Sequence, residues 1–320
     1  MSKQDLVSVI VPAFNAEKYI EETIQSILKQ TYPFIELVLV NDGSTDNTEE
    51  VISKFRHLDN FKYIKIENSG GPSKPRNVGI DNATGNCLFF FDADDLMYPE
   101  KIEETVRFYN LSENQDIGIF ITNFIRVDKT SKKIGSVFLD RYEDFLRANK
   151  FSILDDYYKV EKDIAWDLLI KDNYIGTSSV MLPKHVVEKG FRFDEKVKNA
   201  DDHDLWLRVT LEYNLGFIDK VLHGYRIHGE GLFGTASSRQ IIERARVLEK
   251  HSQHIINKKT KEQVSIKIAK TLYSAGYHHQ NRYEHKEAIR IYIKAFLKYR
   301  RFILLRGAVV CMLKSFKSKL

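Results

Sequence analysis

The sequence has little of what anchors or cross-links a secreted or membrane-spanning protein. It holds two cysteines in 320 residues, Cys87 and Cys311, which cannot build a disulfide framework and suit a reducing compartment. Residues 1–5 lead directly into a strand pattern, without the apolar stretch that a signal peptide needs. We therefore expect the protein to stay in the cytoplasm.

Two glycine-rich phosphate-binding motifs are also missing. No Gly-x-x-x-x-Gly-Lys-Ser/Thr loop occurs, and no Gly-x-Gly-x-x-Gly turn follows the first strand pattern. These absences disfavour a P-loop enzyme and a dinucleotide-binding domain. A sugar nucleotidyltransferase would want a glycine-rich loop with a basic residue after the first strand, where this sequence has Ala13-Phe14-Asn15.

What is present is the composition of a folded protein with unevenly distributed charge. Hydrophobic residues make up 43% and charged residues 29%, and the length suits one large domain with an appendage. Residues 241–320 hold 19 basic and 5 acidic residues, a net of +14, which leaves 30 basic and 39 acidic residues upstream, a net of −9. We predict three regions, spanning residues 1–110, 111–238 and 239–320.

The first hundred residues alternate strand and helix patterns. Apolar runs at 6–11, 34–40, 61–67 and 87–91 are separated by helical periodicity at 19–28, 47–55 and 74–83. This alternation predicts an α/β fold with a mostly parallel sheet flanked by helices, which binds ligands at the carboxyl ends of its strands. Every polar motif considered below follows a strand at that end.

Beyond residue 110 the pattern is less regular. We expect a strand at 117–127 and helices around Trp166 and Leu205, whereas 129–162 shows no clear periodicity. From Arg239 onward the pattern is all helical. Small and aromatic residues there match one tetratricopeptide-like hairpin, at Gly276, Ala288, Tyr292 and Ala295. A single such unit indicates a helical appendage, because stacked repeats need neighbours to bury their faces.

A carboxylate cluster, Asp92-Ala93-Asp94-Asp95, follows the apolar run ending at Phe91. Negative charge beside a buried strand is costly unless a cation or hydrogen-bond donors receive it. Mg²⁺ or Mn²⁺ would do so, because such ions bind one or two carboxylates together with substrate phosphates. The alternative is that Asp94 or Asp95 only caps the helix that begins near Pro99.

Four motifs carry a resemblance to a known family. They occur in the family's order and spacing: Val9-Ile10-Val11-Pro12-Ala13-Phe14-Asn15, Val40-Asn41-Asp42-Gly43-Ser44-Thr45-Asp46, Gly70-Gly71-Pro72-Ser73-Lys74-Pro75-Arg76-Asn77-Val78-Gly79 and Phe91-Asp92-Ala93-Asp94-Asp95. In these the chain resembles glycosyltransferase family 2, whose members have the GT-A fold. The resemblance implies metal-dependent, inverting transfer of a sugar from a nucleotide-diphosphate donor, with 1–110 as the donor-binding half and 111–238 as the acceptor-binding, catalytic half.

The resemblance also implies a set of donor-binding residues. Asp42 would accept a hydrogen bond from a uracil-like base, Arg76 would lie along the diphosphate, and Asp94 would ligate the metal. The full set is Pro12, Ala13, Asn15, Asp42, Asn68, Arg76, Asp92, Ala93 and Asp94. The family usually has alanine where this chain has Pro75, and proline is tolerated in a helix's first turn. A solvated helix charge is the alternative for Arg76.

An acidic pair, Asp201-Asp202, precedes an apolar helix pattern and resembles the family's acidic pair, which is more often Glu-Asp. On that alignment Asp202 is the catalytic base, which takes the proton of the acceptor hydroxyl. A shift of one position would exchange its role with a neighbour. Both acids would in addition interact favourably with the helix macrodipole, whose N-terminal end is positive.

His228, in Gly224-Tyr225-Arg226-Ile227-His228, resembles the family histidine that closes over the donor. Imidazole there would join the metal site of Asp94 and Asp92 or contact phosphate. The alternative is a structural histidine with no ligand.

The C-terminal tail combines a short apolar segment with cations at 299–314, too short to span a bilayer. Two interpretations remain open: a basic helix lying on the inner face of the cell membrane, or a terminal helix packed on the hairpin. The first would suit a glycan acceptor on a lipid carrier. Nucleic acid is not an expected partner, because the tail has no recognised nucleic-acid module.

The sequence thus predicts a glycosyltransferase that uses a UDP-sugar and Mg²⁺ or Mn²⁺ and acts on a glycan or lipid-linked glycan. One alternative is a catalytically silent module that binds sugar nucleotides or glycans. Another is a nucleotidyltransferase, which would release pyrophosphate in place of a nucleoside diphosphate.

Overall fold

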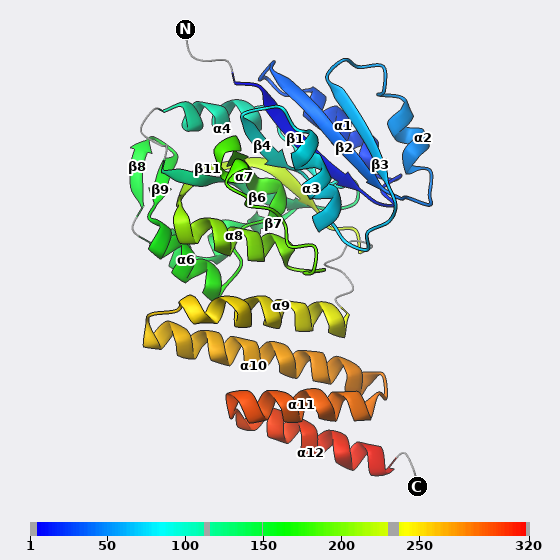
Figure 1. Ribbon diagram of the computed structural model, residues 1–320, viewed down its shortest axis with the longest axis vertical. Helices are drawn as coiled ribbons and strands as arrows, with labels where there is room; N and C mark the ends of the chain where they lie inside the picture. Colours follow the sequence, from blue (N-terminus) through cyan, green and yellow to red (C-terminus); the bar gives the residue numbers. More distant parts are fainter. Residues whose placement is uncertain (1–4, 112–115, 149, 230–236, 318–320) are drawn as a thin grey trace. The chain divides into compact units, whose positions relative to one another are not determined.

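The structure is a computed structural model that describes residues 5–111, 116–148, 150–229 and 237–317 (Figure 1). The chain forms two compact units. The first comprises Met1–Leu169, Asn173–Lys196 and Asp201–His228, and the second comprises Ile170–Asp172, Val197–Ala200 and Gly229–Leu320. This division leaves the functional roles of 1–110, 111–238 and 239–320 as predictions.

The first unit is built on one sheet with the strand order β3-β2-β1-β4-β10-β6-β11-β9-β8, to which β5 and β7 add at β11 and β6. Its strands are β1 (Val7–Ala13), β2 (Ile35–Asp42), β3 (Phe61–Ile66), β4 (Cys87–Phe90), β5 (Leu96–Met97), β6 (Ile117–Val127), β7 (Lys133–Val137), β8 (Phe151–Leu154), β9 (Tyr157–Val160), β10 (Val180–Pro183) and β11 (Asn214–Arg226).

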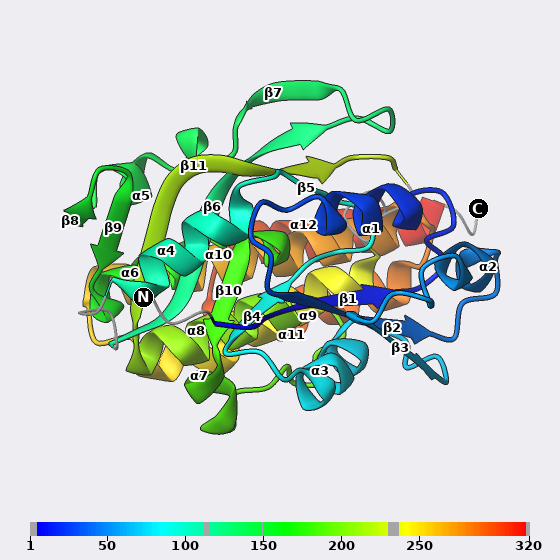
Figure 2. The same ribbon diagram turned by 90° about the horizontal axis from the view of Figure 1, so that it is seen from above.

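The first four strands are parallel, as the sequence predicts. β1 lies between β2 and β4, and β3 pairs with β2. Helices α1 (Ile20–Leu28) and α3 (Ser73–Asn82) cover opposite faces of these strands, while α2 (Thr48–Ser53) follows β2 (Figure 2). Both faces are therefore apolar, which explains the continuous hydrophobic runs of these strands.

The rest of the sheet is mixed. β10 lies antiparallel to both β4 and β6, β6 and β11 are parallel, and β9 and β8 add an antiparallel hairpin at the edge. The predicted strand at 117–127 is β6, and the helices expected around Trp166 and Leu205 are present. The helices of this part are α4 (Lys101–Asn110), α5 (Glu143–Leu146), α6 (Lys162–Lys171), α7 (Lys184–Glu188) and α8 (Asp201–Glu212).

The loops after β1 and β2 are joined to each other by side chains. The backbone N–H of Asn15 donates to Ser44 Oγ at 3.0 Å, and Asn15 Oδ1 accepts from the N–H of Thr45 at 2.8 Å. The N–H of Ala16 donates to Thr48 Oγ1 at 2.7 Å. Asn15 has φ +49°, a left-handed conformation that asparagine tolerates. These bonds hold the carboxyl ends of β1 and β2 in one fixed arrangement.

The second unit contains the helices α9 (Ser238–His251), α10 (Lys258–Asn281), α11 (His285–Tyr299) and α12 (Phe302–Lys317). Gly276 of α10 meets the ring of Tyr292, since a Cβ at Gly276 would lie 2.5 Å from it. Tyr292 is buried, as are Ala288 and Ala295 of α11. The small and aromatic positions of the expected hairpin are therefore its contact positions. Among the residues described, no helix combines the length and the hydropathy needed to cross a membrane.

Candidate active site

The carboxylate cluster lies immediately after β4, in the chain segment that leads to β5. The backbone N–H of Asp92 donates to the Oγ of Ser178 at 3.0 Å, and the N–H of Asp95 donates to the carbonyl of Asp92 at 3.2 Å. Ser178 belongs to a 3₁₀ turn, Thr177–Ser179, that precedes β10. The turn that leads into β10 thus holds the segment that carries Asp92 and Asp94 in place through this hydrogen bond.

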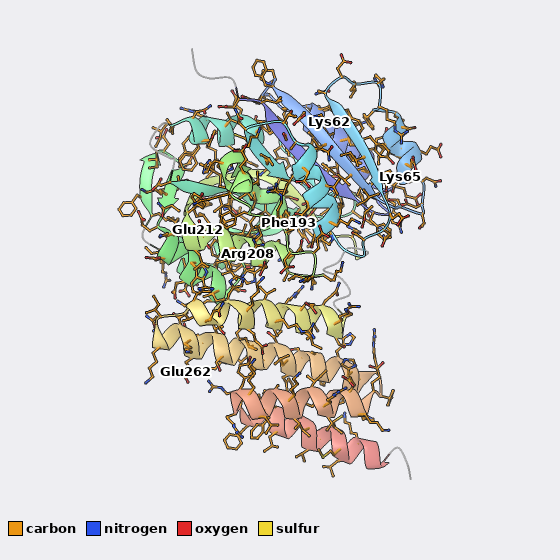
Figure 3. All side chains as sticks on the ribbon, viewed as in Figure 1. Lys62, Lys65, Phe193, Arg208, Glu212 and Glu262 are labelled. Carbon is orange, nitrogen blue, oxygen red and sulfur yellow. The ribbon has the colours of Figure 1, made fainter. Side chains whose placement is uncertain are left out.

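Arg76 of α3 joins the two halves of the site. Its Nη2 lies 2.8 Å from Asp92 Oδ1 and its Nη1 lies 3.0 Å from Asp201 Oδ2. The guanidinium also lies 5.2 Å from the ring centroid of Phe193, which is labelled in Figure 3. Arg76 is only 5% exposed, which rules out the solvated helix charge. Pro75 lies in the first turn of α3, as expected.

The acidic pair at the start of α8 has two different sets of partners. Asp201 forms the ion pair with Arg76, whereas Asp202 accepts from the N–H of His203 at 2.7 Å and faces Thr177 Oγ1 at 3.4 Å. α8 begins at Asp201, so both acids also lie in its first turn, where the macrodipole favours them. Asp202 is half-buried and has no arginine bound directly to its carboxylate among the bonds described.

The electrostatics of the site are dominated by an excess of acids, of which Asp95 and Asp201 are buried and Asp92 and Asp202 half-buried. Burial raises the pKa of Asp92, Asp201 and Asp202, and the charge of Arg76 acts in the opposite direction on each of them. Burial, together with Asp94 and Asp92, raises the pKa of Asp95 well above its ordinary value. One guanidinium is thus surrounded by several carboxyl groups, and such a site favours an added cation.

Asp94 faces His228, which follows β11. His228 Nε2 lies 2.8 Å from Asp94 Oδ2, and the imidazole lies 4.6 Å from the ring of Tyr19 between centroids. The other ring nitrogen, Nδ1, is buried without a partner in the described part of the chain. The structure therefore brings together Asp94 and His228, two of the three residues that the sequence associated with a metal.

Arg226 is a residue that the sequence reasoning missed. Its Nε donates to the carbonyl of Asp94 at 2.7 Å, and its N–H donates to Asp95 Oδ1 at 2.9 Å. Its Nη2 forms an ion pair with Glu22 of α1 at 2.6 Å. Arg226 thereby fixes the backbone of the acidic cluster against β11. A cation two residues before the candidate histidine was the available signal.

The other group of predicted residues lies at the ends of β1, β2 and β3. Asp42 is buried, and its two carboxylate oxygens accept from the N–H and the Oγ of Ser69 at 2.9 and 3.0 Å. Asn68 Nδ2 donates to the Asp42 carbonyl at 3.1 Å. Gly43 has φ +68°, and a Cβ there would lie 2.7 Å from the Asn68 nitrogen, so a side chain would not fit.

Pro12 and Ala13 end β1 and lie beside β2, where Ala13 pairs with Asn41. Ala93 is buried, and its carbonyl accepts from Thr23 Oγ1 at 3.0 Å. All the predicted donor-binding residues thus lie at one edge of the sheet, in or beside the loops that follow the first four strands. They form two groups. The residues that end or follow β1, β2 and β3 are Pro12, Ala13, Asn15, Asp42 and Asn68, and the residues on α3 or after β4 are Arg76, Asp92, Ala93 and Asp94.

The residues fit a metal that is shared with a substrate. No set of three or more histidine, cysteine or acidic side chains within the described ranges is placed to hold an ion by itself. Mg²⁺ and Mn²⁺ do not require such a set, because one or two carboxylates suffice when substrate phosphates supply further oxygens. Asp94, which contacts His228, and the neighbouring acids offer the carboxylate oxygens that such an ion binds.

With this geometry established, comparisons with known proteins identify the family. The sequence matches the family described as Glycosyl transferase family 2 over residues 8–168. It is 32% identical over 231 residues to an uncharacterized glycosyltransferase of Rickettsia prowazekii, which covers 72% of this chain and 67% of that protein. The chain therefore belongs to glycosyltransferase family 2.

Two solved structures support the fold, and the first of them, TarS, also matches the chain in sequence. The chain is 44% identical over 104 residues to the poly(ribitol-phosphate) beta-N-acetylglucosaminyltransferase TarS of Staphylococcus aureus, covering 32% of this chain and 18% of TarS. The structure of TarS 1–349 in complex with UDP-GlcNAc superposes with a TM-score of 0.63 at 19% identity, covering 98% of this chain and 92% of that one.

The mannosyltransferase PcManGT of Pyrobaculum calidifontis, in complex with GDP-Man and Mn²⁺, gives a TM-score of 0.57 at 18% identity. That superposition covers 100% of this chain and 89% of PcManGT. The first unit accordingly has the GT-A fold, with a mixed sheet flanked by helices, and it is followed in the chain by the helices of the second unit.

Proposed function

We propose that the protein transfers a sugar from a UDP-sugar to a hydroxyl group of a glycan or lipid-linked glycan, with inversion at the anomeric carbon. The observation that carries this proposal is the network in which Arg76 bridges Asp92, after β4, to Asp201, next to Asp202 at the start of α8. A donor-side carboxylate and a candidate base are thereby held in one site. The proposal assigns donor binding to 1–110 and acceptor binding with catalysis to 111–238.

For the donor, the residues at the ends of β1, β2 and β3 are the proposed nucleoside pocket. Asp42 and Asn68 are polar groups fixed by hydrogen bonds, and the Asn15 bonds keep the two loops together. TarS, a relative with the same fold, has been crystallised with UDP and with UDP-GlcNAc. This supports a uridine-diphosphate donor, and an N-acetylhexosamine is the first sugar to test.

For the chemistry, we assign the base to Asp202. Its ionised carboxylate would take the proton of the acceptor hydroxyl as that oxygen bonds to the anomeric carbon. The bond from the anomeric carbon to the diphosphate oxygen breaks in the same step, and the electron pair leaves with the nucleoside diphosphate. A single displacement of this kind inverts the configuration. The raised pKa of Asp202 makes it a stronger base than an exposed aspartate.

Asp94, Asp92 and His228 are the proposed holders of Mg²⁺ or Mn²⁺. A divalent ion there would neutralise charge on the departing diphosphate. PcManGT, which shares the fold, has been crystallised with Mn²⁺. Arg76, held between two carboxylates, would orient Asp92 and add positive charge beside the diphosphate.

The test is release of nucleoside diphosphate from a panel of UDP- and GDP-sugars, with Mg²⁺, Mn²⁺ or a chelator. We expect turnover of a UDP-sugar that the chelator abolishes and that Asp94→Asn lowers at least a hundredfold. Asp59→Asn, at an exposed aspartate beyond α2, is the matched control and should keep full activity. Absence of turnover with every donor, together with unchanged nucleotide affinity in Asp94→Asn, would refute the assignment.

A further inference from the structure

The last helix of the second unit, α12, presents an apolar face to solvent. Phe302 is 82% exposed and Leu313 is 61% exposed. Among the α12 side chains that the structure describes, the other exposed apolar ones are Ile303, Leu305, Val309, Val310 and Met312. We call this set, with Phe302 and Leu313, the α12 outer face. Most of these side chains also line a shallow depression in the surface, beside Arg306.

The opposite side of α12 packs into the core of the second unit. Leu304, Ala308 and Cys311 are buried, at the spacing of three and four residues that marks one side of a helix. They form a core cluster with Ala288 and Tyr292 of α11. Packing on the hairpin, one of the two interpretations of the tail, thus explains the inner side of α12 and leaves its outer face unexplained.

An apolar outer face is unusual on a helix side that faces solvent. Such a side normally carries charged and polar residues, with the apolar residues on the side that packs against the core. Contiguous exposed apolar surface generally marks a contact with another molecule or a membrane. The α12 outer face therefore requires an occupant.

The charge around this face indicates which occupant. After Glu287 the chain has no further acidic residue, and it has nine lysines and arginines. Arg306 and Lys314 lie on α12 and are exposed. A second copy of this unit would bring two strongly positive surfaces together, which is electrostatically unfavourable. An anionic surface would instead be attracted, and it would meet apolar and basic side chains on the same helix.

We propose that the α12 outer face binds the surface of a bilayer that contains anionic lipid. The apolar side chains enter the boundary between headgroups and acyl chains, while Arg306 and Lys314 extend to the lipid phosphates. The helix lies on the membrane without crossing it. This inference concerns a surface apart from the sugar-transfer site and stands whether or not that reaction is the one proposed above.

The test is flotation of the full chain with vesicles of phosphatidylcholine alone or with about a third phosphatidylglycerol. We expect binding only to the anionic vesicles, and weaker binding at high salt. The double variant V309D/L313D should lower the bound fraction about tenfold. The matched control is I256D/Y283D, which places the same two charges on exposed apolar residues outside α12 and should bind within twofold of the wild type.

Three outcomes would overturn the proposal. One is failure of the wild type to float with anionic vesicles at low salt, and another is an equal loss in both double variants. The third is a dimer by light scattering that only V309D/L313D dissociates, in the absence of vesicle binding, which would show that a second copy covers the face. Thermal unfolding of each variant checks its fold, and nucleoside-diphosphate release should be the same in both, since neither alters the transfer site.

Discussion

The two units treat charge and apolar surface in opposite ways. In the first unit, Arg76 and Asp201 are both buried, and the cost of burying them is offset by their pairing. In the second unit, Phe302 and Leu313 are exposed on the same helix as the exposed cations Arg306 and Lys314. In these two units, whether a side chain is buried follows the availability of partners more closely than its polarity. The first unit supplies partners internally, whereas α12 depends on an external one.

Among substitutions in the first unit, Asp202→Asn should have the greatest effect. Asp202→Asn removes the proposed base, so the rate of transfer should fall by a factor of about 10² to 10⁴ while donor affinity changes little. Asp163→Asn, which alters an exposed acid in the first turn of α6, is the matched control for the macrodipole and should have no effect. Steady-state kinetics with saturating donor make the comparison. Equal losses in both variants would reduce Asp202 to a helix-terminal acid.

The pH dependence of the wild type gives a second view of the same residue. Burial raises the pKa of Asp202, and the ionised form is the active one. The rate should therefore increase as pH rises through that raised pKa, at a pH above the range of an exposed aspartate, which is about 3.9. An acidic limb that persists unchanged in the residual activity of Asp202→Asn would belong to another group.

The next effect concerns the pairing of buried charge. Arg76→Met leaves the buried Asp201 and the half-buried Asp92 without their cation, which should lower the free energy of unfolding by about 3 to 5 kcal/mol at neutral pH. Without Arg76 the folded-state pKa of both acids rises further, so the loss should be smallest at low pH and grow as pH rises. Urea unfolding at pH 5 and pH 8 measures it. Arg147→Met, in an exposed ion pair with Glu143, should cost less than about 1 kcal/mol.

The smallest effect is expected at Lys101 of α4, a buried cation that has only a hydroxyl as its described hydrogen-bond partner. Lys101 Nζ donates to Thr122 Oγ1 at 2.6 Å, and burial lowers the pKa of Lys101 to about 7. The unfolded chain holds this proton up to about pH 10.4, so the free energy of unfolding should rise between pH 7 and that value.

Lys101→Met removes this dependence and should therefore stabilise the protein more at pH 6 than at pH 9, by about 2 kcal/mol. Thermal unfolding at the two pH values tests the difference. Lys29→Met, at an exposed lysine just after α1, should show none. A pH-independent result for Lys101→Met would mean that Lys101 keeps its charge when buried without a charged partner, which would contradict the dependence of buried charge on partners in the first unit.

The sequence predicts some of these features because they are local. The apolar runs of β1 to β4 identify parallel strands, and the polar residues that follow each strand are brought to one edge by the topology itself. The ion pair between Arg76 and Asp201 could not be predicted in this way. Its partners lie on different helices, and no periodicity relates them.

Other features escaped because their determinants are tertiary. β10 has only four residues, and its antiparallel position between β4 and β6 depends on the packing of the second half of the sheet. The exposed strand β8 at the edge of the sheet has no alternation to reveal it. For α12, the composition allowed either packing or membrane contact, and only the structure shows that one side is buried and the other exposed.

The bond between Arg76 and Asp201 also has a consequence for the order of folding. It joins residues 125 positions apart along the chain, so a long loop must close before it can form. A fragment ending at residue 168, where the family match ends, would contain all four motifs of the family resemblance and still lack Asp201, one of the two acids that hold Arg76. The ion pair can therefore form only when the segments that carry Arg76 and Asp201, α3 and α8, have come together.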